Sequence, residues 1–449
     1  NSTMMKCGQR SNTQNHNVKM ITRFAILLVI LSAGTALSQS LNFRVNNYFY
    51  TWQRIDSLSD NSDAKTTHMR GYQNFLLEYK NDKWSFNTLA QTEEDVLNKI
   101  GRGFGYRFYN AYIKGSNLFD MLDVKLGRQY VFAGTGKGAI DGMYLKLKAG
   151  EHKEYQFVLY GGALTPYTYE FSNYPDVKNN YHFGGQFNSY GIRDLTASLS
   201  YSNKKSTPEP YTAKRLDSAY NLVERTIDLN GPAQQLLGLD LNYTYLGQHR
   251  FFGRFYYDAL QNQIYRAEVN ARLKLTDNVN AFSEYIYRNP YFSYNSIFWV
   301  FSYNQNQEIS GGLDYTFEDG LNLFGKVGVV FYDDDNSTRL QLGVSHPNYG
   351  LSFVRYMGYA GESDGVTGYY QRKLFEELSA SASLSYSRYR LGNIYDTDMI
   401  NSFSGMLGFT YRPMSQFSVD VQGQLLSNKI YQTDMRLLFG FSYWSFTKL

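Results

Sequence analysis

The sequence predicts an all-β fold, a transmembrane antiparallel up-and-down β-barrel, from three observations. Apolar and polar residues alternate along repeated stretches of about eleven residues. Aromatic residues make up 17% of the 449 residues, with 42 Tyr among them, although the mean hydropathy is −0.45. A secretory signal precedes the first alternating stretch. Soluble cores are mainly aliphatic, so this composition suits a sheet with one apolar face and one wet face.

The signal occupies the first 38 residues. The apolar stretch from Phe24 to Ala33 follows the basic Arg23 and leads into the small-residue sequence Ala36-Leu37-Ser38. It is too short to span a bilayer. A basic start, a short apolar region and small residues are typical of a cleaved secretory signal. We expect residues 1–38 to be removed on export and residues 39–449 to form the barrel.

Removal of this leader changes the charge and the thiol content. The leader holds Cys7, the only cysteine of the chain, and no acidic residue. Four of the 44 basic residues also lie in it, namely Lys6, Arg10, Lys19 and Arg23. The remaining 40 basic residues balance the 40 acidic ones, so the net charge is near zero. This balance gives no support to a nucleic-acid partner.

The stretch from Tyr265 to Leu275 shows the alternation most clearly. One face carries Tyr265, Ala267, Val269, Ala271, Leu273 and Leu275, and the other carries Arg266, Glu268, Asn270, Arg272 and Lys274. A period of two predicts strands. A soluble β-sandwich has the same period, but its strands run roughly five or six residues. A tilted strand that crosses a bilayer needs roughly 9–11, which favours the membrane barrel.

Short connections rich in Asn, Asp, Gly and Pro alternate with longer ones along the chain. The expected long connections are 56–66, 96–102, 132–139, 163–179, 204–232, 290–304 and 393–398. Short turns on the periplasmic side and long loops outside are typical of outer-membrane barrels. We count about 22 strands between Leu41 and Phe446, with 18 or 20 as alternatives, and place both ends in the periplasm. We expect no plug domain, which argues against a TonB-dependent receptor.

One hairpin has a distinctive sequence, from Asp123 to Leu147. It contains Leu126-Gly127-Arg128-Gln129, the glycine-rich run from Gly134 to Gly138, and Asp141-Gly142. This segment resembles a hairpin of porin-like outer-membrane barrels, including the alginate-export families. The resemblance implies a passive pore and indicates no particular solute. Arg128 interrupts the outward-facing series Leu122, Val124 and Leu126, which predicts a bulge near Gly127 or a position at the membrane interface.

Charged residues on the other strand face are candidates for lining the pore. They are Lys125, Lys146, Arg254, Arg266, Glu268, Arg272, Glu284, Arg288, Asp314, Lys326, Arg339 and Asp420. Charges of both signs are typical of a pore lining, and the basic excess predicts a weak anion preference. The alternative is that many of them form ion pairs that seal the interior.

The connection 214–229 is a candidate constriction. Apolar residues recur in it at helical spacing, as Leu216, Ala219, Tyr220, Val223 and Ile227. We expect a short helix folded into or over the barrel mouth, since a wide barrel needs an obstruction. The residues expected to face the opening are Arg215, Asp217, Tyr220, Glu224 and Arg225.

No constellation predicts catalysis or a metal site. The five histidines after the leader are widely scattered, at positions 68, 152, 182, 249 and 346. None has metal-ligand spacing to another, and no cysteine remains. We therefore expect no enzyme activity, no cofactor and no metal.

The sequence favours a porin of a Gram-negative outer membrane that allows passive diffusion of small polar or ionic solutes. The alternative is a barrel that sheathes a partner, such as a multihaem cytochrome of an electron conduit. Further expected partners are outer-membrane lipid and lipopolysaccharide, and the barrel-assembly machinery. Assembly into a homo-oligomer, or with a periplasmic partner, stays open.

Overall fold

The computed structural model describes residues 39–56, 66–101, 103–207, 210–228, 233–289, 305–332, 335–358, 361–390 and 398–448. The expected signal, residues 1–38, lies outside them. Over this part of the chain the regular elements are 24 strands, of which 22 form one sheet and two form a separate hairpin. Among these residues, no helix is long and apolar enough to cross a membrane.

The strands have the following bounds. The first nine are β1 (Gln39–Asp56), β2 (His68–Asn81), β3 (Trp84–Leu97), β4 (Gly105–Leu118), β5 (Leu122–Ala133), β6 (Gly136–Ala149), β7 (Tyr155–Leu164), β8 (Asn180–Ile192) and β9 (Leu195–Ser206). The separate hairpin is β10 (Tyr211–Leu216) and β11 (Leu222–Ile227). The sheet continues with β12 (Gln234–Tyr245), β13 (His249–Asp258), β14 (Gln263–Lys274), β15 (Val279–Arg288), β16 (Asn306–Thr316), β17 (Asn322–Phe331), β18 (Asn336–His346), β19 (Tyr349–Gly358), β20 (Glu362–Lys373), β21 (Leu378–Arg390), β22 (Ile400–Met414), β23 (Phe417–Ser427) and β24 (Tyr431–Lys448).

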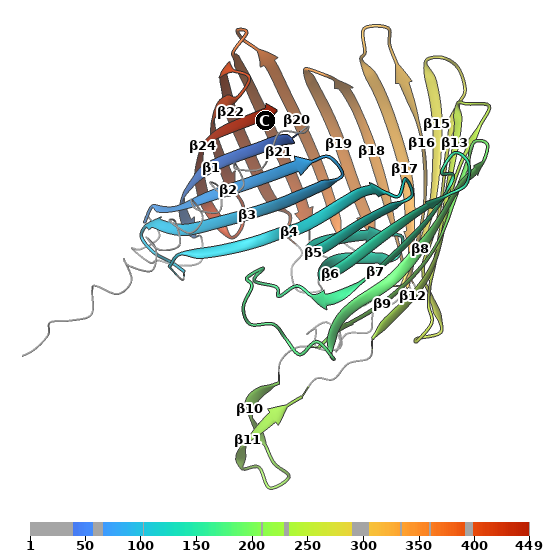
Figure 1. Ribbon diagram of the computed structural model, residues 1–449. Coiled ribbons are helices and arrows are strands. Elements are labelled where there is room, and N and C mark those ends of the chain that lie inside the picture. Colours follow the sequence, from blue (N-terminus) through green and yellow to red (C-terminus); the bar gives the residue numbers. More distant parts are fainter. Residues whose placement is uncertain are drawn as a thin grey trace, which may run out of the picture.

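The sheet closes into a barrel (Figure 1). Each strand pairs antiparallel with its sequence neighbours, β9 pairs with β12, and β1 pairs with β24 to complete the ring. Ser40 lies opposite Lys448, so the sheet begins and ends at the same end of the barrel. The predicted 22-stranded, all-β barrel is therefore confirmed.

The two ends of the barrel differ in their connections. At the end where β1 begins, strands are joined by turns of two to five residues, as at 82–83 and 347–348. We call this the turn end. The opposite, loop end carries the long connections at 57–67, 165–179, 207–233 and 289–305. Some links there are also short, such as 359–361.

The outer face of the barrel is apolar along its strands. On β14, Val269 is 56% exposed, and Leu313 and Leu342 on β16 and β18 are about half exposed. Their sequence neighbours turn polar groups to the other face, as the period of two predicts. A soluble sheet would cover such a face, whereas a membrane barrel presents it to lipid. The chain is a membrane-spanning β-barrel.

The segment from 211 to 227 corrects one prediction. It forms the β10–β11 hairpin, with Tyr211 opposite Ile227, and the helix expected over 214–229 is wrong. Asp217 explains the difference, because its carboxylate accepts hydrogen bonds from the backbone N–H groups of Ala219 and Asn221. This Asx turn reverses the chain where a helix would continue. The hairpin extends away from the barrel wall (Figure 1).

Candidate functional site: a hairpin folded into the barrel

The β5–β6 pair leaves the wall near the loop end. β5 pairs with β4 only as far as Arg128, and β6 pairs with β7 only from Ile140 onward. Residues 130–139 therefore pair only with one another in the sheet, and we call them the inner hairpin. The long external loop expected at 132–139 is wrong, since a two-residue turn at 134–135 joins the strands.

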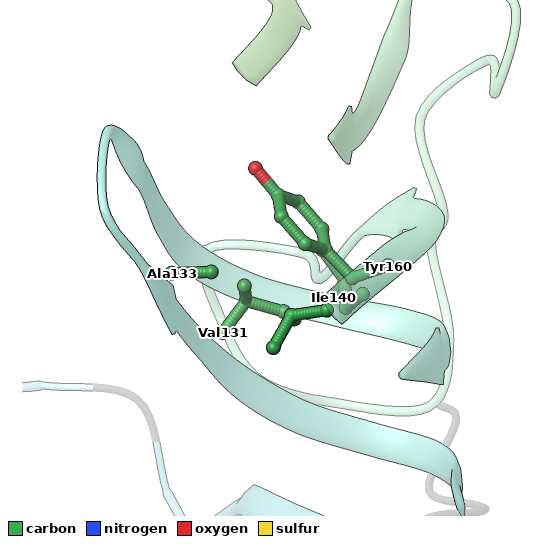
Figure 2. Packing of buried hydrophobic residues seen from close by; sticks show 5 residues of the cluster. Val131, Ala133, Ile140 and Tyr160 are labelled. Atoms are coloured by element: carbon green, nitrogen blue, oxygen red, sulfur yellow. The ribbon is translucent and has the colours of Figure 1, made fainter. Parts of the chain in front are cut away.

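The inner hairpin packs onto the inside of the neighbouring wall. Val131, Ala133 and Ile140 are at most 1% exposed, and they form a cluster with Val158 and Tyr160 of β7. Figure 2 shows the arch of the hairpin with Val131, Ala133 and Ile140 on it and the Tyr160 ring beside it. Burial of a Val or Ile side chain stabilises by about 2 kcal/mol. The hairpin is therefore held as a fixed part of the barrel.

Glycines allow the tip to approach the wall closely. Gly134 has a φ of 58°, and a Cβ there would lie 2.3 Å from the Ser200 hydroxyl of β9. A Cβ on Gly136 would lie 1.8 Å from the Tyr160 hydroxyl. The Thr135 backbone N–H donates a hydrogen bond to the Ser200 hydroxyl oxygen at 3.1 Å. The backbone of the glycine-rich run thus packs directly against side chains of β7 and β9.

Arg128 anchors the point where the hairpin leaves the wall. Its fully buried guanidinium donates Nε–H to Asp141 Oδ1 at 2.8 Å and Nη2–H to Asp141 Oδ2 at 2.9 Å. It also donates to the Phe108 carbonyl oxygen of β4 at 3.2 Å. Gly127 takes a φ of 120°, while the pairing of β5 with β6 continues through it without a shift. The expected bulge near Gly127 is wrong, because the backbone turns here without an inserted residue. The Arg128 side chain is fully buried, and its position at the membrane interface stays a prediction.

The β7–β8 connection, residues 165–179, binds beside this anchor. Arg128 donates hydrogen bonds to the carbonyl oxygens of Tyr169 and Glu170, and its guanidinium stacks 4.1 Å from the Phe171 ring centroid. The Phe108 N–H of β4 donates to the same Tyr169 carbonyl. Burial raises the pKa of Tyr174, whose hydroxyl donates to Asp141 at 2.6 Å. The connection thus contacts β4 where β5 has turned inward.

The free face of the inner hairpin borders a pocket of about 310 Å³. Phe132 is 72% exposed, and the Lys137 ammonium lies 5.0 Å from its ring centroid. The same pocket is lined by residues of five wall strands, among them Lys146, Gln156, Gln186, Asp240 and Arg254. An aromatic ring, several amides and charges of both signs therefore meet at one level of the interior. Such a surface can bind or screen small polar solutes.

Most of the predicted pore-lining charges lie in ion pairs along the inner face of β12 to β18. The pairs are Arg254–Asp240 at 2.7 Å, Arg266–Glu268 at 2.6 Å, Arg272–Asp314 at 2.7 Å, Lys326–Glu284 at 3.5 Å and Arg339–Glu308 at 3.7 Å. Arg254 also reaches Glu268 at 3.8 Å, which links two of these pairs. Asp420 accepts a hydrogen bond from Thr410.

Three lysines of β5 and β6, namely Lys125, Lys137 and Lys146, form no such pairs within the described residues. Lys125 lies over the Tyr112 and Tyr144 rings, at 5.4 and 5.1 Å. Lys146 and Lys137 line the pocket without a carboxylate within ion-pair distance. Arg288 lies opposite Arg266 in the β14–β15 register. The interior is thus electrically uneven, with paired charges along β12 to β18 and unpaired lysines near the hairpin.

The residues expected to form a constriction lie elsewhere. Arg215 is on β10, Glu224 and Arg225 are on β11, and Asp217 and Tyr220 are in the turn between these strands. Tyr220 is 84% exposed, and the side-chain hydrogen bonds of Asp217 stay within the turn. The structure does not bring these five residues to the pocket.

Sequence reasoning missed Phe132, Lys137 and the Arg128–Asp141 pair as parts of the site. Two features of the sequence could have indicated these residues. Apolar residues flank the glycine-rich turn, and the charged Arg128 interrupts a series of outward-facing apolar residues. Over the described residues, no group of three His, Cys, Asp or Glu side chains has the arrangement of a metal site.

Comparison with known proteins finds similarity in structure only. No protein-family model matches the chain, and no curated protein matches its sequence. Acinetobacter baumannii OccAB4 aligns with 10% identity over 92% of this chain and 99% of its own, with a TM-score of 0.43. Pseudomonas aeruginosa OpdQ aligns with 11% identity over 90% and 98%, with a TM-score of 0.41. The translocation pore of the P pilus usher PapC aligns with 9% identity over 90% and 99%, with a TM-score of 0.42.

Proposed function

We propose that the protein is an outer-membrane porin that allows passive diffusion of small polar or ionic solutes. The observation that carries the proposal is the inner hairpin, which narrows a closed barrel at a level lined by amides and charges. The signal expected in residues 1–38 directs export, and the turn end faces the periplasm. The predicted pore-lining residues serve as the wall of this path.

Selectivity follows from the uneven charge. Ion pairs such as Arg254–Asp240 contribute little net field at a distance, because the two charges cancel. Lys125, Lys137 and Lys146 have no such partners within the described residues. The path therefore prefers anions weakly. The inner hairpin also occupies interior space that a sheathed partner would need, so we favour the porin over the sheath.

Conductance in a planar bilayer tests the proposal, with two deletions that separate the two candidate constrictions. One variant replaces residues 130–139 by an Asn-Gly turn between Gln129 and Ile140, which lie opposite each other in register. The matched control replaces residues 212–226 of the β10–β11 hairpin by a short linker.

We expect the intact protein to form stable, small channels and the first deletion to raise the single-channel conductance. The control should conduct like the intact protein. An intact barrel that carries no current, or that carries a large current unchanged by the first deletion, contradicts the porin. The second result would favour the sheath, whose current should fall when the partner enters.

A further inference from the structure

A row of charged residues lies on the outer face of β19 to β21, close to the loop end. Arg355 lies opposite Asp364, which lies opposite Arg388, and Glu362 lies opposite Arg390 in the next row. The outward direction follows from the register, because Phe353, Val366 and Tyr386 occupy the same face one row nearer the turn end. These charges thus begin where the apolar, lipid-facing surface stops.

This charged row is local. At corresponding outward positions near the loop ends of β15 to β18, the side chains are uncharged, namely Tyr287, Gln307, Phe331 and Thr338. Below the row, the outward side chains are apolar and accessible, with Val366 40%, Tyr386 46% and Phe403 39% exposed. The Tyr386 hydroxyl points to the charged level, where it donates a hydrogen bond to Asn401.

The row has a cationic excess. Arg390 pairs with Glu362 at 3.0 Å, and Arg355 lies 3.6 Å from Asp364, with both side chains of each pair 40% exposed or more. Arg388 is exposed and makes no ion pair within the described residues. Three guanidinium groups against two carboxylates leave one positive charge. The loosely held Arg355 and the unpaired Arg388 flank Asp364 and present their donors outward.

We infer that this row binds the phosphate groups of the phosphorylated glycolipid, lipopolysaccharide, in the outer leaflet. The inference rests on the proposed outer-membrane location. Guanidinium groups donate paired hydrogen bonds that fit phosphate oxygens. The apolar residues one row below contact the acyl chains of the same molecule, so head group and chains meet complementary surfaces. The occupant is a lipid held against the barrel, because both surfaces lie on its outer wall.

Native mass spectrometry of the detergent-solubilised protein tests this inference with diphosphoryl lipid A as the probe. The main variant is Arg388→Gln, which removes a charge without leaving a carboxylate unpaired. A second variant adds Arg355→Gln. The matched control is Arg372→Gln, which lies on the same outward face of β20 at the turn end.

We expect the single variant to bind lipid A roughly fivefold more weakly and the double variant more weakly still. The control should bind like the intact protein, and lipid A without phosphates should bind all forms equally. Equal binding of phosphorylated lipid A by the intact protein and the double variant overturns the inference. So does an equal loss in the control, or full displacement of the lipid by millimolar inorganic phosphate.

Conductance measured on the same samples separates this inference from the porin proposal. Both arginines lie outside the barrel, so the channels of the variants should be unchanged. A barrel that conducts but does not discriminate phosphorylated lipid A contradicts the lipid site alone. A barrel that binds the lipid through these arginines but carries no current contradicts the porin alone.

Discussion

Arg128 and Asp141 form a two-point ion pair, 2.8 and 2.9 Å long, at the position where β5 and β6 turn out of the barrel wall. The two residues lie opposite each other in register, so the pair spans the base of the inner hairpin. A bidentate pair fixes the angle between its partners as well as their distance. It therefore sets the direction in which residues 130–139 enter the interior.

Removal of the cation at this base should loosen the hairpin. Arg128→Met keeps most of the side-chain volume but leaves Asp141, whose side chain is 17% exposed, without its charge partner. Loss of one partner of a buried pair costs about 3–5 kcal/mol, so the free energy of unfolding in urea should fall by that order. Single-channel recordings should also become noisier as the hairpin moves.

Arg193→Met is the control for this prediction. Arg193 pairs with Asp194 at 3.5 Å in a turn, with the arginine side chain 95% exposed. Exposed pairs contribute little, so stability and channel noise should stay as in the intact protein. Similar losses in both variants would show that Arg128 is no special anchor.

The close approach of the hairpin tip gives a second prediction. Gly136→Ala places a methyl carbon 1.8 Å from the Tyr160 hydroxyl oxygen. This distance is shorter than any non-bonded contact, so the tip must lift from the wall. Overpacking of this kind costs about 1–3 kcal/mol in the free energy of unfolding, and channel conductance should change with it.

Adding Tyr160→Ala should restore the conductance of the Gly136→Ala variant by removing the clashing ring. Gly423→Ala in β23 is the matched control, since a Cβ there meets nothing within 4 Å. If the Gly136 and Gly423 variants behave alike, the tip does not dock as described.

Most of the barrel could be predicted from the alternation of residues, and the inner hairpin could not. In β14 the outward Val269 and the inward Glu268 follow directly from a period of two. The same period holds in β5 after Arg128, whether the strand stays in the wall or bends inward. Only tertiary contacts, such as those of Val131 and Ile140 with β7, decide between these paths.

The prediction of a helix over 214–229 failed for a different reason. The positions of Leu216, Val223 and Ile227 fit a helical face, but they also occur on two short strands joined by a turn. The deciding interaction is the Asx turn at Asp217, a local feature that apolar spacing does not register. The charges of β12 to β18 were identified by strand phase, but their pairing across strands depends on register, which the sequence leaves open.

The unpaired lysine of the hairpin predicts the ion preference. Lys137→Glu changes the charge beside the pocket by two units, close to Asp240. The chloride-to-potassium permeability ratio should fall roughly three- to tenfold, as expected for charges acting across a hydrated path. The reversal potential in a salt gradient measures this ratio, and the effect should shrink in high salt.

Lys214→Glu makes the same charge change on the exposed β10 strand, away from the pocket. We expect the reversal potential to stay at the value of the intact protein. A shift as large as that of Lys137→Glu would assign the selectivity to the β10–β11 hairpin.

The two faces of the wall should respond differently to one added charge. Val269→Arg places a cation on the outer face of β14, where the native side chain is 56% exposed to lipid, and should cost about 2–4 kcal/mol in the free energy of unfolding. Gln341→Arg places the same group on the inner face of β18, opposite Lys326, where water solvates it. This second variant should assemble normally and alter conductance. Heat-modifiable gel migration after refolding into lipid measures assembly, and equal losses in both variants would mean that the assigned faces are reversed or mixed.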